Sequence, residues 1–386
     1  MLTGAVQWTT QERVIHGKPV IEAVPAEIER VGAKRVLLLT TQSLVNSRLI
    51  REVTSALGDR CAGRYSAIAA HSPREAVIAG ATLARDVGAD HLLAVGGGSV
   101  VDATKTMLLA LWRGVGDVEA LSKLATKRGE APLEIAATDR AMRMTAVPTT
   151  LSAAEFSSGA GITDMQRKVK LSFSHPLMAP IAVILDPAAT LETPMELMLS
   201  TGMRAMDHAV ERWCSIRPHP LADGLALQAM GMLAENLPAI KARPADLEPR
   251  LNCQLAAWLT QVSNAPGVPN GASHGIGYIL GGYAGVPHGI TSCISLAATL
   301  EWNEVVNGER QRVVADRLGR AGGRPCEAMR DFVKALGLPT RLGDVGITAD
   351  RIAELARQYD GTGPIATNPR PVRGADDVAA ILKLAV

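Results

Sequence analysis

The sequence predicts two domains of different class, an α/β domain over residues 1–188 and an all-helical domain over residues 189–386. In the first part, short apolar runs alternate with helical stretches, which is the pattern of a mostly parallel sheet covered by helices. After residue 188 such runs almost vanish, and the apolar residues of long segments follow the helical period. A chain of 386 residues is long enough to give both parts a substantial core.

Four apolar runs are the clearest strand candidates of the first domain. Each is bounded by polar residues, glycine or proline, as expected of strands that helices cover on both faces. They are RVLLLT at 35–40, HLLAVG at 91–96, RMTAVP at 143–148 and IAVILD at 181–186. Residues 116–142 lack a clear period, so we expect a surface excursion or lid there. In the second domain, residues 221–242 carry helical apolar spacing.

Charge and composition exclude several classes of protein. Forty basic and thirty-eight acidic residues leave a net charge of +2, without the basic stripe that nucleic acid favours. No apolar run approaches the roughly 20 residues that span a bilayer, and the polar N-terminus is unlike a signal peptide. The five cysteines are scattered and odd in number, which favours reduced thiols. We therefore expect a cytoplasmic protein that binds neither nucleic acid nor membrane.

A glycine-rich turn directly follows the strand at 91–96 and opens a predicted helix. It consists of Gly96, Gly97, Gly98 and Ser99. Glycines let backbone N–H groups approach a phosphate closely, and the positive end of the helix dipole suits a pyrophosphate. The motif is not the GxGxxG fingerprint, so a tight turn without a ligand is the alternative.

A second loop of the same kind follows the strand at 143–148 and carries Thr149, Thr150 and Ser152. Ligands of open α/β sheets lie beyond the carboxyl ends of the strands, so hydroxyl groups there are well placed for a nucleotide. Alone, this loop would more commonly be a helix cap. Together, the two loops favour a nucleotide cofactor.

The second domain contains the run SHGIGYILGGYAGVPHG, in which a glycine-rich turn separates His274 from His288. Tyr278 lies four residues after His274, and Arg204 lies four residues before His208. Each of these pairs therefore shares one face of a helix. We expect the three histidines, the tyrosine and the arginine to converge on one cleft between the domains.

Each of these residues also has a structural explanation. A single helical histidine such as His208 is more commonly a hydrogen-bonded core or surface residue. His288 could cap a turn, and Arg204 could form an ion pair between the domains. The methionines at 195, 198, 203 and 206 are more typical of core packing than of a cofactor site. We give the remaining histidines the structural interpretation, namely His16, His71, His91, His175 and His219.

In their ordered combination these motifs resemble the group III, iron-containing alcohol dehydrogenase family. The resemblance covers nearly the whole chain and includes the further segments DATK, ILDP, HAVE and TNPRP. It implies a Rossmann-like domain that carries NAD or NADP and an all-helical domain, in the dehydroquinate synthase-like fold, with the active site between them. It also implies that Lys170 lies near the nicotinamide ribose, although alone it could be a surface lysine.

In metal-dependent members of that family, an Asp four residues before the first histidine and three histidines hold a divalent ion. The resemblance matches the histidines to His208, His274 and His288, but Arg204 stands at the Asp position. A guanidinium repels a second cation at close range, so we expect no bound metal. Asp207 is the nearest substitute carboxylate, but it points about 100° around the helix from His208. A rescued metal site, and with it a metal-dependent (Fe or Zn) alcohol dehydrogenase, is the alternative.

Maleylacetate reductases form a branch of the family that works without metal. The chain resembles this branch in lacking the Asp, in its compact loop between 150 and 155, and in Thr41, which replaces the ribose-binding Asp of many alcohol dehydrogenases. It departs from the branch at Asp102, Arg204 and Tyr278. We therefore expect a metal-independent reduction of a carbonyl group, in an acidic substrate, by NADH or NADPH; the uncharged Thr41 does not separate the two cofactors.

Carbonyl reduction needs a hydride donor, a group that stabilises the developing alkoxide and a proton source. We expect Arg204, with the histidines, to stabilise the alkoxide or to anchor a substrate carboxylate. His274 is a better proton donor than Tyr278, because the unperturbed pKa is about 6.5 for histidine and about 10 for tyrosine. A lyase like dehydroquinate synthase and a cofactor-binding protein without catalysis are rival interpretations. Enzymes of this size are commonly symmetric, so we expect a homodimer.

Overall fold

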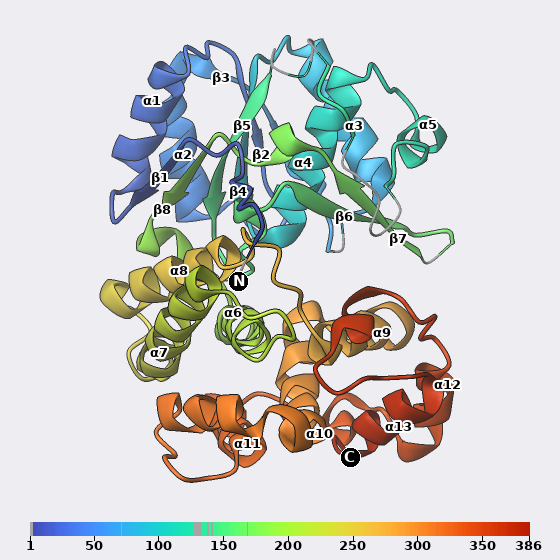
Figure 1. Ribbon diagram of the computed structural model, residues 1–386. Helices are drawn as coiled ribbons and strands as arrows, with labels where there is room; N and C mark the ends of the chain where they lie inside the picture. Colours follow the sequence, from blue (N-terminus) through green and yellow to red (C-terminus); the bar gives the residue numbers. More distant parts are fainter. Residues whose placement is uncertain (1–2, 71, 127–132, 137–138, 140–141, 168) are drawn as a thin grey trace. The chain divides into compact units, whose positions relative to one another are not determined.

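The computed structural model describes residues 3–386 apart from 71, 127–132, 137–138, 140–141 and 168. The chain divides into two compact units, an α/β unit of Trp8–Thr193 and a helical unit of Pro194–Val386 with Met1–Gln7 (Figure 1). The predicted boundary at residue 188 lies inside a short 3-10 helix, Pro187–Thr190. The hydroxyl of Thr193 donates to the carbonyl of Thr149 at 2.7 Å, which keeps this segment with the sheet.

Six parallel strands form the sheet of the α/β unit, in the order β1-β8-β5-β4-β2-β3. The strands are β1 (Arg13–His16), β2 (Val36–Leu39), β3 (Cys61–Tyr65), β4 (His91–Gly96), β5 (Arg143–Pro148) and β8 (Ala182–Leu185). The four predicted strands are confirmed as β2, β4, β5 and β8. The edge strands β1 and β3 were not predicted, because their half-exposed residues mix charged, polar and apolar types. An antiparallel hairpin of β6 (Gly159–Asp164) and β7 (Val169–Ser174) was also not predicted.

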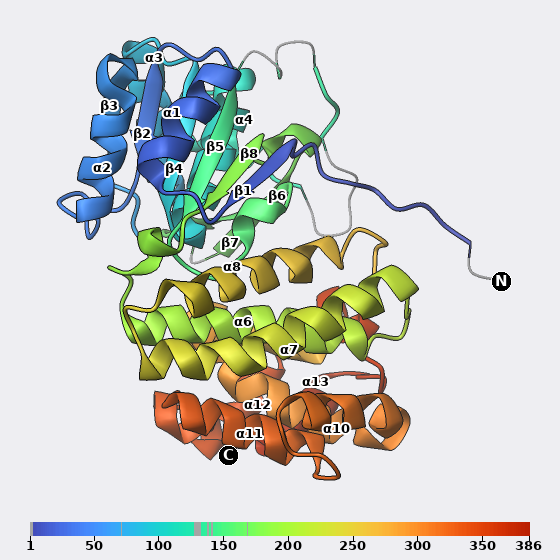
Figure 2. The same ribbon diagram turned by 90° about the vertical axis from the view of Figure 1, so that its left-hand side faces the viewer.

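Helices cover both faces of this sheet (Figures 1 and 2). They are α1 (Val20–Arg30), α2 (Arg48–Leu57), α3 (Arg74–Asp86) and α4 (Gly98–Trp112); the shorter α5 (Val118–Ser122) lies within the predicted excursion, part of which falls outside the described residues. Side chains alternate along a strand. Leu38, Leu93 and Val95 therefore pack with α1 and α2 in one core. The opposite face of the sheet is covered by α3 and α4, which contact each other.

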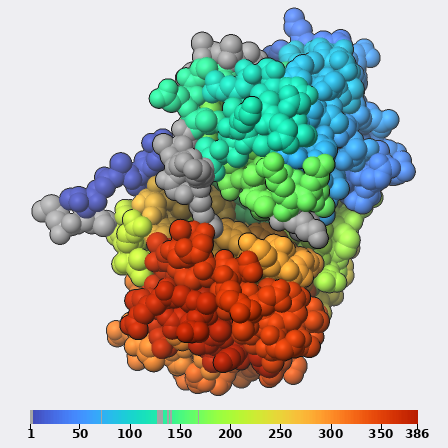
Figure 3. Space-filling view, turned by 90° about the vertical axis from the view of Figure 1, so that its right-hand side faces the viewer, coloured from blue at the N-terminus to red at the C-terminus, as the bar shows by residue number. Residues whose placement is uncertain are grey.

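The helical unit is built around α6 (Met195–Trp213), which contacts α7, α8, α9 and α10. Its other helices are α7 (Pro220–Ala242), α8 (Leu247–Val262), α9 (Ala272–Ala284), α10 (His288–Arg317), α11 (Pro325–Leu336), α12 (Ile352–Ala356) and α13 (Ala375–Lys383). The helix predicted over 221–242 is confirmed as α7. Every residue of α6 from Met198 to Asp207 is buried, so this helix has no solvent-facing side along that stretch. The C-terminal residues, drawn in red, cover one face of the unit (Figure 3).

The glycine-rich run of the second domain is mostly helix, which corrects the turn expected between His274 and His288. Residues 272–284 form α9, and the left-handed backbone begins only at Gly285, with a φ of 69°. Within α9, a Cβ on Gly277 would lie 2.8 Å from the hydroxyl of Thr291 on α10. On α10, a Cβ on Gly289 would lie 2.7 Å from the carbonyl carbon of Ser200 on α6. The glycines of this run therefore let three helices approach closely.

Three histidines outside the run have structural roles, as expected. His91 Nε2 lies 3.0 Å from the hydroxyl of Thr145, and His175 Nε2 lies 3.0 Å from the carboxylate of Asp139. The side chain of His219 accepts a hydrogen bond from the backbone N–H of Leu221 at the start of α7. His16 is exposed on β1, and His71 lies outside the described residues.

No helix in the described part of the chain is both long and apolar enough to cross a membrane. The five cysteines, all within this part, form no disulfide. Four of them are buried, and burial raises the pKa of Cys214 to about 12. Thiols of this kind remain protonated and unreactive near neutral pH.

His91 should make the stability of the α/β unit depend on pH. Burial lowers its pKa from 6.5 to about 4, so between these values the unfolded chain binds a proton that the folded chain does not. The free energy of unfolding therefore falls as the pH drops through this window, by about 3 kcal/mol in all. Urea denaturation at pH 7 and at pH 5 measures this fall in the free energy of unfolding, and we expect it to be smaller for His91→Asn than for the wild type. His16→Asn, at an exposed position, is the control and should lose as much stability between pH 7 and pH 5 as the wild type. An equal loss in all three proteins would show that His91 does not cause the pH dependence.

Candidate active site

The two loops expected to hold a cofactor lie side by side in the α/β unit. Strands β4 and β5 pair in parallel, with Gly96 opposite Pro148, so both loops leave the same edge of the sheet. The backbone N–H of Thr149 donates to the carbonyl of Gly96 at 3.1 Å. The predicted glycine turn and the predicted hydroxyl-bearing loop are therefore joined at their first residues.

Further along, the glycines of the first loop meet hydroxyl side chains of the second. A Cβ on Gly97 would lie 3.0 Å from Thr150 Cγ2, and a Cβ on Gly98 would lie 2.9 Å from the hydroxyl of Ser152. The hydroxyl oxygens of Thr150 and Ser152 are buried and have no hydrogen-bond partner among the described residues. Helix α4 begins at Gly98, so its first N–H groups point to the same place. A cradle that excludes Cβ atoms and contains unsatisfied donors fits the pyrophosphate of a dinucleotide.

Three other expected cofactor residues, Thr41, Lys170 and Ser99, lie in the same unit. Thr41 follows β2, whose neighbours β3 and β4 lie on its two sides, and its hydroxyl is 2.9 Å from that of Ser43. The strand order thus reverses beside the glycine turn, which is where ligands of open α/β sheets bind. Lys170 lies on β7 with its side chain over Gly161 of β6, and Ser99 accepts a hydrogen bond from Ser72 through its carbonyl.

The helical unit brings the five expected catalytic residues together from α6, α9 and α10. His274 Nε2 lies 2.9 Å from His208 Nδ1. The rings of Tyr278 and His288 stack with their centroids 6.0 Å apart. The guanidinium of Arg204 lies 5.8 Å from the centroid of the Tyr278 ring. Residues that are 84 positions apart in the chain thus form one cluster of ionisable and aromatic side chains.

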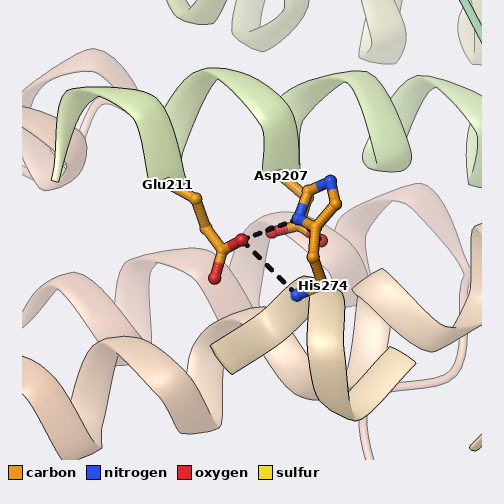
Figure 4. A group of neighbouring side chains, drawn as sticks. All are labelled: Asp207, Glu211 and His274. Carbon is orange, nitrogen blue, oxygen red and sulfur yellow. Dashed lines mark hydrogen bonds and ion pairs between the residues drawn. The ribbon is translucent and has the colours of Figure 1, made fainter. Parts of the chain in front are cut away.

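Two carboxylates complete this cluster, and the sequence analysis did not place either of them in the site. His274 Nδ1 lies 2.6 Å from Glu211 Oε2 and 3.4 Å from Asp207 Oδ2 (Figure 4). Asp207 lies about 100° around α6 from His208, as expected, yet it still contacts His274 on α9. This contact is possible because neighbouring helices surround this stretch of α6. The HAVE segment, which ends in Glu211, contained the signal for the second carboxylate.

Glu211 also anchors the start of α9. Its carboxylate accepts hydrogen bonds from the backbone N–H groups of Gly271 at 2.9 Å and Ser273 at 2.8 Å, in addition to the contact with the His274 ring. A negative charge at a helix N-terminus is favourable because the first N–H groups have no partner within the helix. One side chain therefore fixes both the position of α9 and the orientation of His274.

Asp207 plays the corresponding part for Arg204. Arg204 is 4% exposed, and its Nη1 lies 3.0 Å from the hydroxyl of Ser292 and 3.4 Å from Asp207 Oδ2. The hydroxyls of Ser292 and Ser273 both donate to the same Asp207 oxygen, at 2.6 and 3.0 Å. The buried guanidinium of Arg204 thus has its own counter-charge within one helical turn.

The charges of the cluster separate the two neighbouring histidines. Burial, followed by the positive charges of His274 and Arg204, holds the pKa of His208 well below its ordinary value. Burial and Arg204 also act to lower the pKa of His274, but the carboxylates of Asp207 and Glu211 outweigh them, so this pKa is raised. Burial alone would raise the pKa of Asp207, yet His274 and Arg204 lower it. These shifts favour the neutral form of His208 and the protonated form of His274, in which His208 Nδ1 accepts the Nε2–H of His274.

This arrangement changes the role expected of His274. Its side chain is fully buried, and both ring nitrogens already contact Glu211 and His208. A proton on His274 can reach a substrate only through His208, which is half-buried. Of this histidine pair, His208 is the less buried, and the exposed His288 is the third histidine of the cluster.

Three side chains of the cluster also have the composition of a metal site. Asp207, Glu211 and His274 each offer a ligand atom within 4.8 Å of the others. A metal needs deprotonated nitrogens with free lone pairs. Here Nδ1 of His274 donates to Glu211, its Nε2 faces His208, and the Asp207 oxygen nearest to them accepts two serine hydroxyls. With the Arg204 guanidinium 3.4 Å from Asp207, the donor set does not fit a divalent cation.

Comparison with known families identifies the chain. Residues 11–187 match the model of iron-containing alcohol dehydrogenases, and residues 198–386 match that of the Fe-containing alcohol dehydrogenase family, C-terminal. The chain belongs to the iron-containing alcohol dehydrogenase family. It is 31% identical to maleylacetate reductase 2 of Cupriavidus pinatubonensis, over 80% of this chain and 77% of that protein. It is 28% identical to the NAD-dependent methanol dehydrogenase of Bacillus methanolicus, over 96% and 97% of the two chains.

The solved structures agree with this assignment. Maleylacetate reductase from Agrobacterium tumefaciens superposes with a TM-score of 0.83 and 25% identity, covering 100% of this chain and 98% of that one. The resemblance to this family near its maleylacetate reductase branch, and the predicted α/β and helical architecture, are confirmed. As a member of the iron-containing alcohol dehydrogenase family, the protein is an NAD(P)-dependent oxidoreductase that acts on alcohols or carbonyl compounds.

Gly98→Ala should weaken cofactor binding while leaving the fold intact. Alanine suits the first turn of α4 better than glycine, but its Cβ would lie 2.9 Å from the Ser152 hydroxyl in the cradle. We expect the dissociation constant for NADH, or for NADPH if that binds better, to rise about tenfold in fluorescence titrations. Gly116→Ala is the matched control, because nothing lies within 4 Å of a Cβ at that position. Equal affinities of the two variants would show that the cradle does not hold the cofactor.

Proposed function

We propose that this oxidoreductase reduces the carbonyl group of an acidic substrate with NADH or NADPH and without a bound metal ion. The observation that carries the proposal is the buried Arg204, which stands where metal-dependent relatives hold a metal-binding Asp and pairs with Asp207. Its guanidinium supplies a fixed positive charge in a largely dry environment, where such a charge is most effective on a developing alkoxide. The similarity to maleylacetate reductases, up to 31% identity, also favours an acidic carbonyl compound.

A reduced nicotinamide held by the glycine turn with Thr150 and Ser152 would supply the hydride, and in the proposed mechanism Arg204 stabilises the alkoxide that develops on the substrate oxygen. The alkoxide takes the proton from His208 Nε2. At the same time His208 Nδ1 takes the proton from Nε2 of His274, at 2.9 Å, so that no imidazolate forms and His274 is left neutral. This His274 keeps its Nδ1 proton on Glu211, at 2.6 Å. The substrate thus gains one hydride and one proton, and the buried pair recovers a proton from solvent.

A metal-dependent alcohol dehydrogenase is the second candidate, because Asp207, Glu211 and His274 could in principle form a ligand set. Binding would require the loss of the His274 contacts to Glu211 and His208 and the displacement of two serine hydroxyls from Asp207. The carboxylate nearest to the arginine already serves as its counter-ion. These contacts favour the metal-free reaction over the metal-dependent one.

The reaction and its independence of metal can be tested together. Purified enzyme is analysed for bound metal, and the oxidation of NADH and NADPH is followed with maleylacetate and with simple aldehydes, before and after chelation. We expect turnover of the acidic substrate that survives chelation and is unchanged by added Fe²⁺ or Zn²⁺. Activity that disappears with the chelator and returns with one of these ions would overturn the metal-free proposal. Turnover of simple aldehydes but not of maleylacetate would contradict the proposal that the substrate is acidic.

Arg204 provides the sharpest single-residue test. Arg204→Ala removes the cation proposed to stabilise the alkoxide or to bind the substrate carboxylate, so we expect kcat/KM for the acidic substrate to fall by more than tenfold. Arg217→Ala is the control, because Arg217 is exposed on the same unit.

The variant Arg204→Asp restores the residue of metal-dependent relatives. It should gain bound Fe²⁺ or Zn²⁺ in elemental analysis, whereas the wild type should hold none. Near wild-type kinetics of the alanine variant would remove Arg204 from the mechanism.

A further inference from the structure

A buried lysine lies directly behind the cofactor cradle of the α/β unit. Lys105, on the second turn of α4, is fully buried. Its ammonium group donates to the carbonyls of Ala154 at 2.6 Å and Gly159 at 2.9 Å, and to the hydroxyl of Ser157 at 3.1 Å. An ammonium has three donors, so all of them are used within one short segment. Lys105 cannot touch a cofactor, yet a buried charge is costly unless it has a structural task.

The segment that Lys105 holds contains strained backbone. Ala153 adopts a left-handed conformation, with a φ of 59°, although it is not a glycine. This conformation is unfavourable for a residue with a Cβ and persists only where the surroundings fix it. Ala153 lies between Ser152, whose unsatisfied hydroxyl faces Gly98, and Ala154, whose carbonyl binds Lys105. The strained residue therefore connects the cradle to the lysine.

Asp102 strengthens the same connection from the preceding turn of α4. Its Oδ2 accepts the backbone N–H of Gly161 at 3.0 Å, at the start of β6. Its Oδ1 lies 3.9 Å from the Lys105 ammonium. The helix that begins at the glycine turn thus binds both the second cofactor loop and the hairpin that follows it.

We propose that Lys105 is a positioning residue for the cofactor: it clamps residues 154–159 and so keeps Ala153 in the strained conformation that holds Thr150 and Ser152 against the glycine turn. This inference rests on the proposed cofactor site. It assigns to Lys105 an effect on cofactor affinity although Lys105 does not contact the cofactor. If Lys105 had a purely structural role, its replacement would lower the stability of the unit. Its effect on cofactor affinity would then be the same with alanine or glycine at position 153. A comparison of these two residues at position 153 provides the test.

The test measures binding of NADH, or of NADPH if the wild type prefers it, by fluorescence titration and calorimetry on the full-length protein. Lys105→Met keeps the length of the side chain but removes the clamp, and we expect the dissociation constant to rise at least tenfold. Ala153→Gly alone should change it less than threefold. In the double variant Lys105→Met/Ala153→Gly, glycine adopts the left-handed conformation without strain. Its dissociation constant should therefore be about fivefold lower than that of Lys105→Met alone. Hydrogen exchange of residues 150–160 should follow the same order.

Lys34→Met is the matched control, because Lys34 is an exposed lysine just before β2, at the amino-terminal edge of the sheet, and this variant should bind like the wild type. If Lys105→Met does not fold, Ser157→Ala removes one partner of the ammonium and should weaken binding about threefold, again with recovery by Ala153→Gly. Wild-type affinity of a folded Lys105→Met would contradict the proposed clamp. If that variant does not fold, wild-type affinity of Ser157→Ala would contradict it. A loss of affinity that Ala153→Gly does not reduce would assign Lys105 a structural role only and overturn it as well. Failure of the wild type to bind either dinucleotide would instead contradict the cofactor site itself.

Discussion

The catalytic cluster depends on one constraint, the neutralisation of a positive charge buried on α6. A guanidinium that is 4% exposed requires an opposite charge and hydrogen-bond partners close by, and Arg204 finds both in Asp207 and Ser292. His274 repeats this arrangement, because its ring lies close to both Asp207 and Glu211. These carboxylates favour a positive charge on His274 and raise its pKa. Burial, followed by the charges of His274 and Arg204, lowers the pKa of His208.

Such short contacts are possible only because three helices approach closely. The Cβ positions of Gly277 and Gly289 would collide with Thr291 and with the backbone of Ser200, so larger residues would push α9 and α10 away from each other or from α6. A shift of 1 Å would lengthen the contact of His274 with Glu211 from 2.6 Å beyond hydrogen-bond range. The glycines of the histidine run therefore act on the chemistry through helix packing.

Much of the fold could be predicted from the sequence, because interior strands such as β4 are buried on both faces and carry continuous apolar runs. The edge strands β1 and β3 lack this pattern. They form by pairing with β8 and β2, and a local sequence pattern does not reveal such pairing. In the site, the spacing of Arg204 and His208 predicted a shared helix face, and the histidine run predicted the partners on other helices. The contact of Asp207 with His274 was not predicted, because helical geometry gives the direction of a side chain but not the number of helices around it.

The buried lysine of the α/β unit escaped prediction for a related reason. The partners of Lys105 are two backbone carbonyls and one hydroxyl, and backbone groups leave no trace in the pattern of side chains. The two proposed sites nevertheless share one feature: a buried charged side chain lies behind the groups that we propose to meet the ligand. Lys105 stands in this relation to Thr150 and Ser152, and Glu211 to His208 through His274. Because buried charges of this kind need nearly complete sets of partners, the backbone around them has little freedom. The groups proposed to meet cofactor and substrate are thereby held in place by their buried neighbours, and preorganisation of this kind is the condition for electrostatic stabilisation of a transition state without reorganisation.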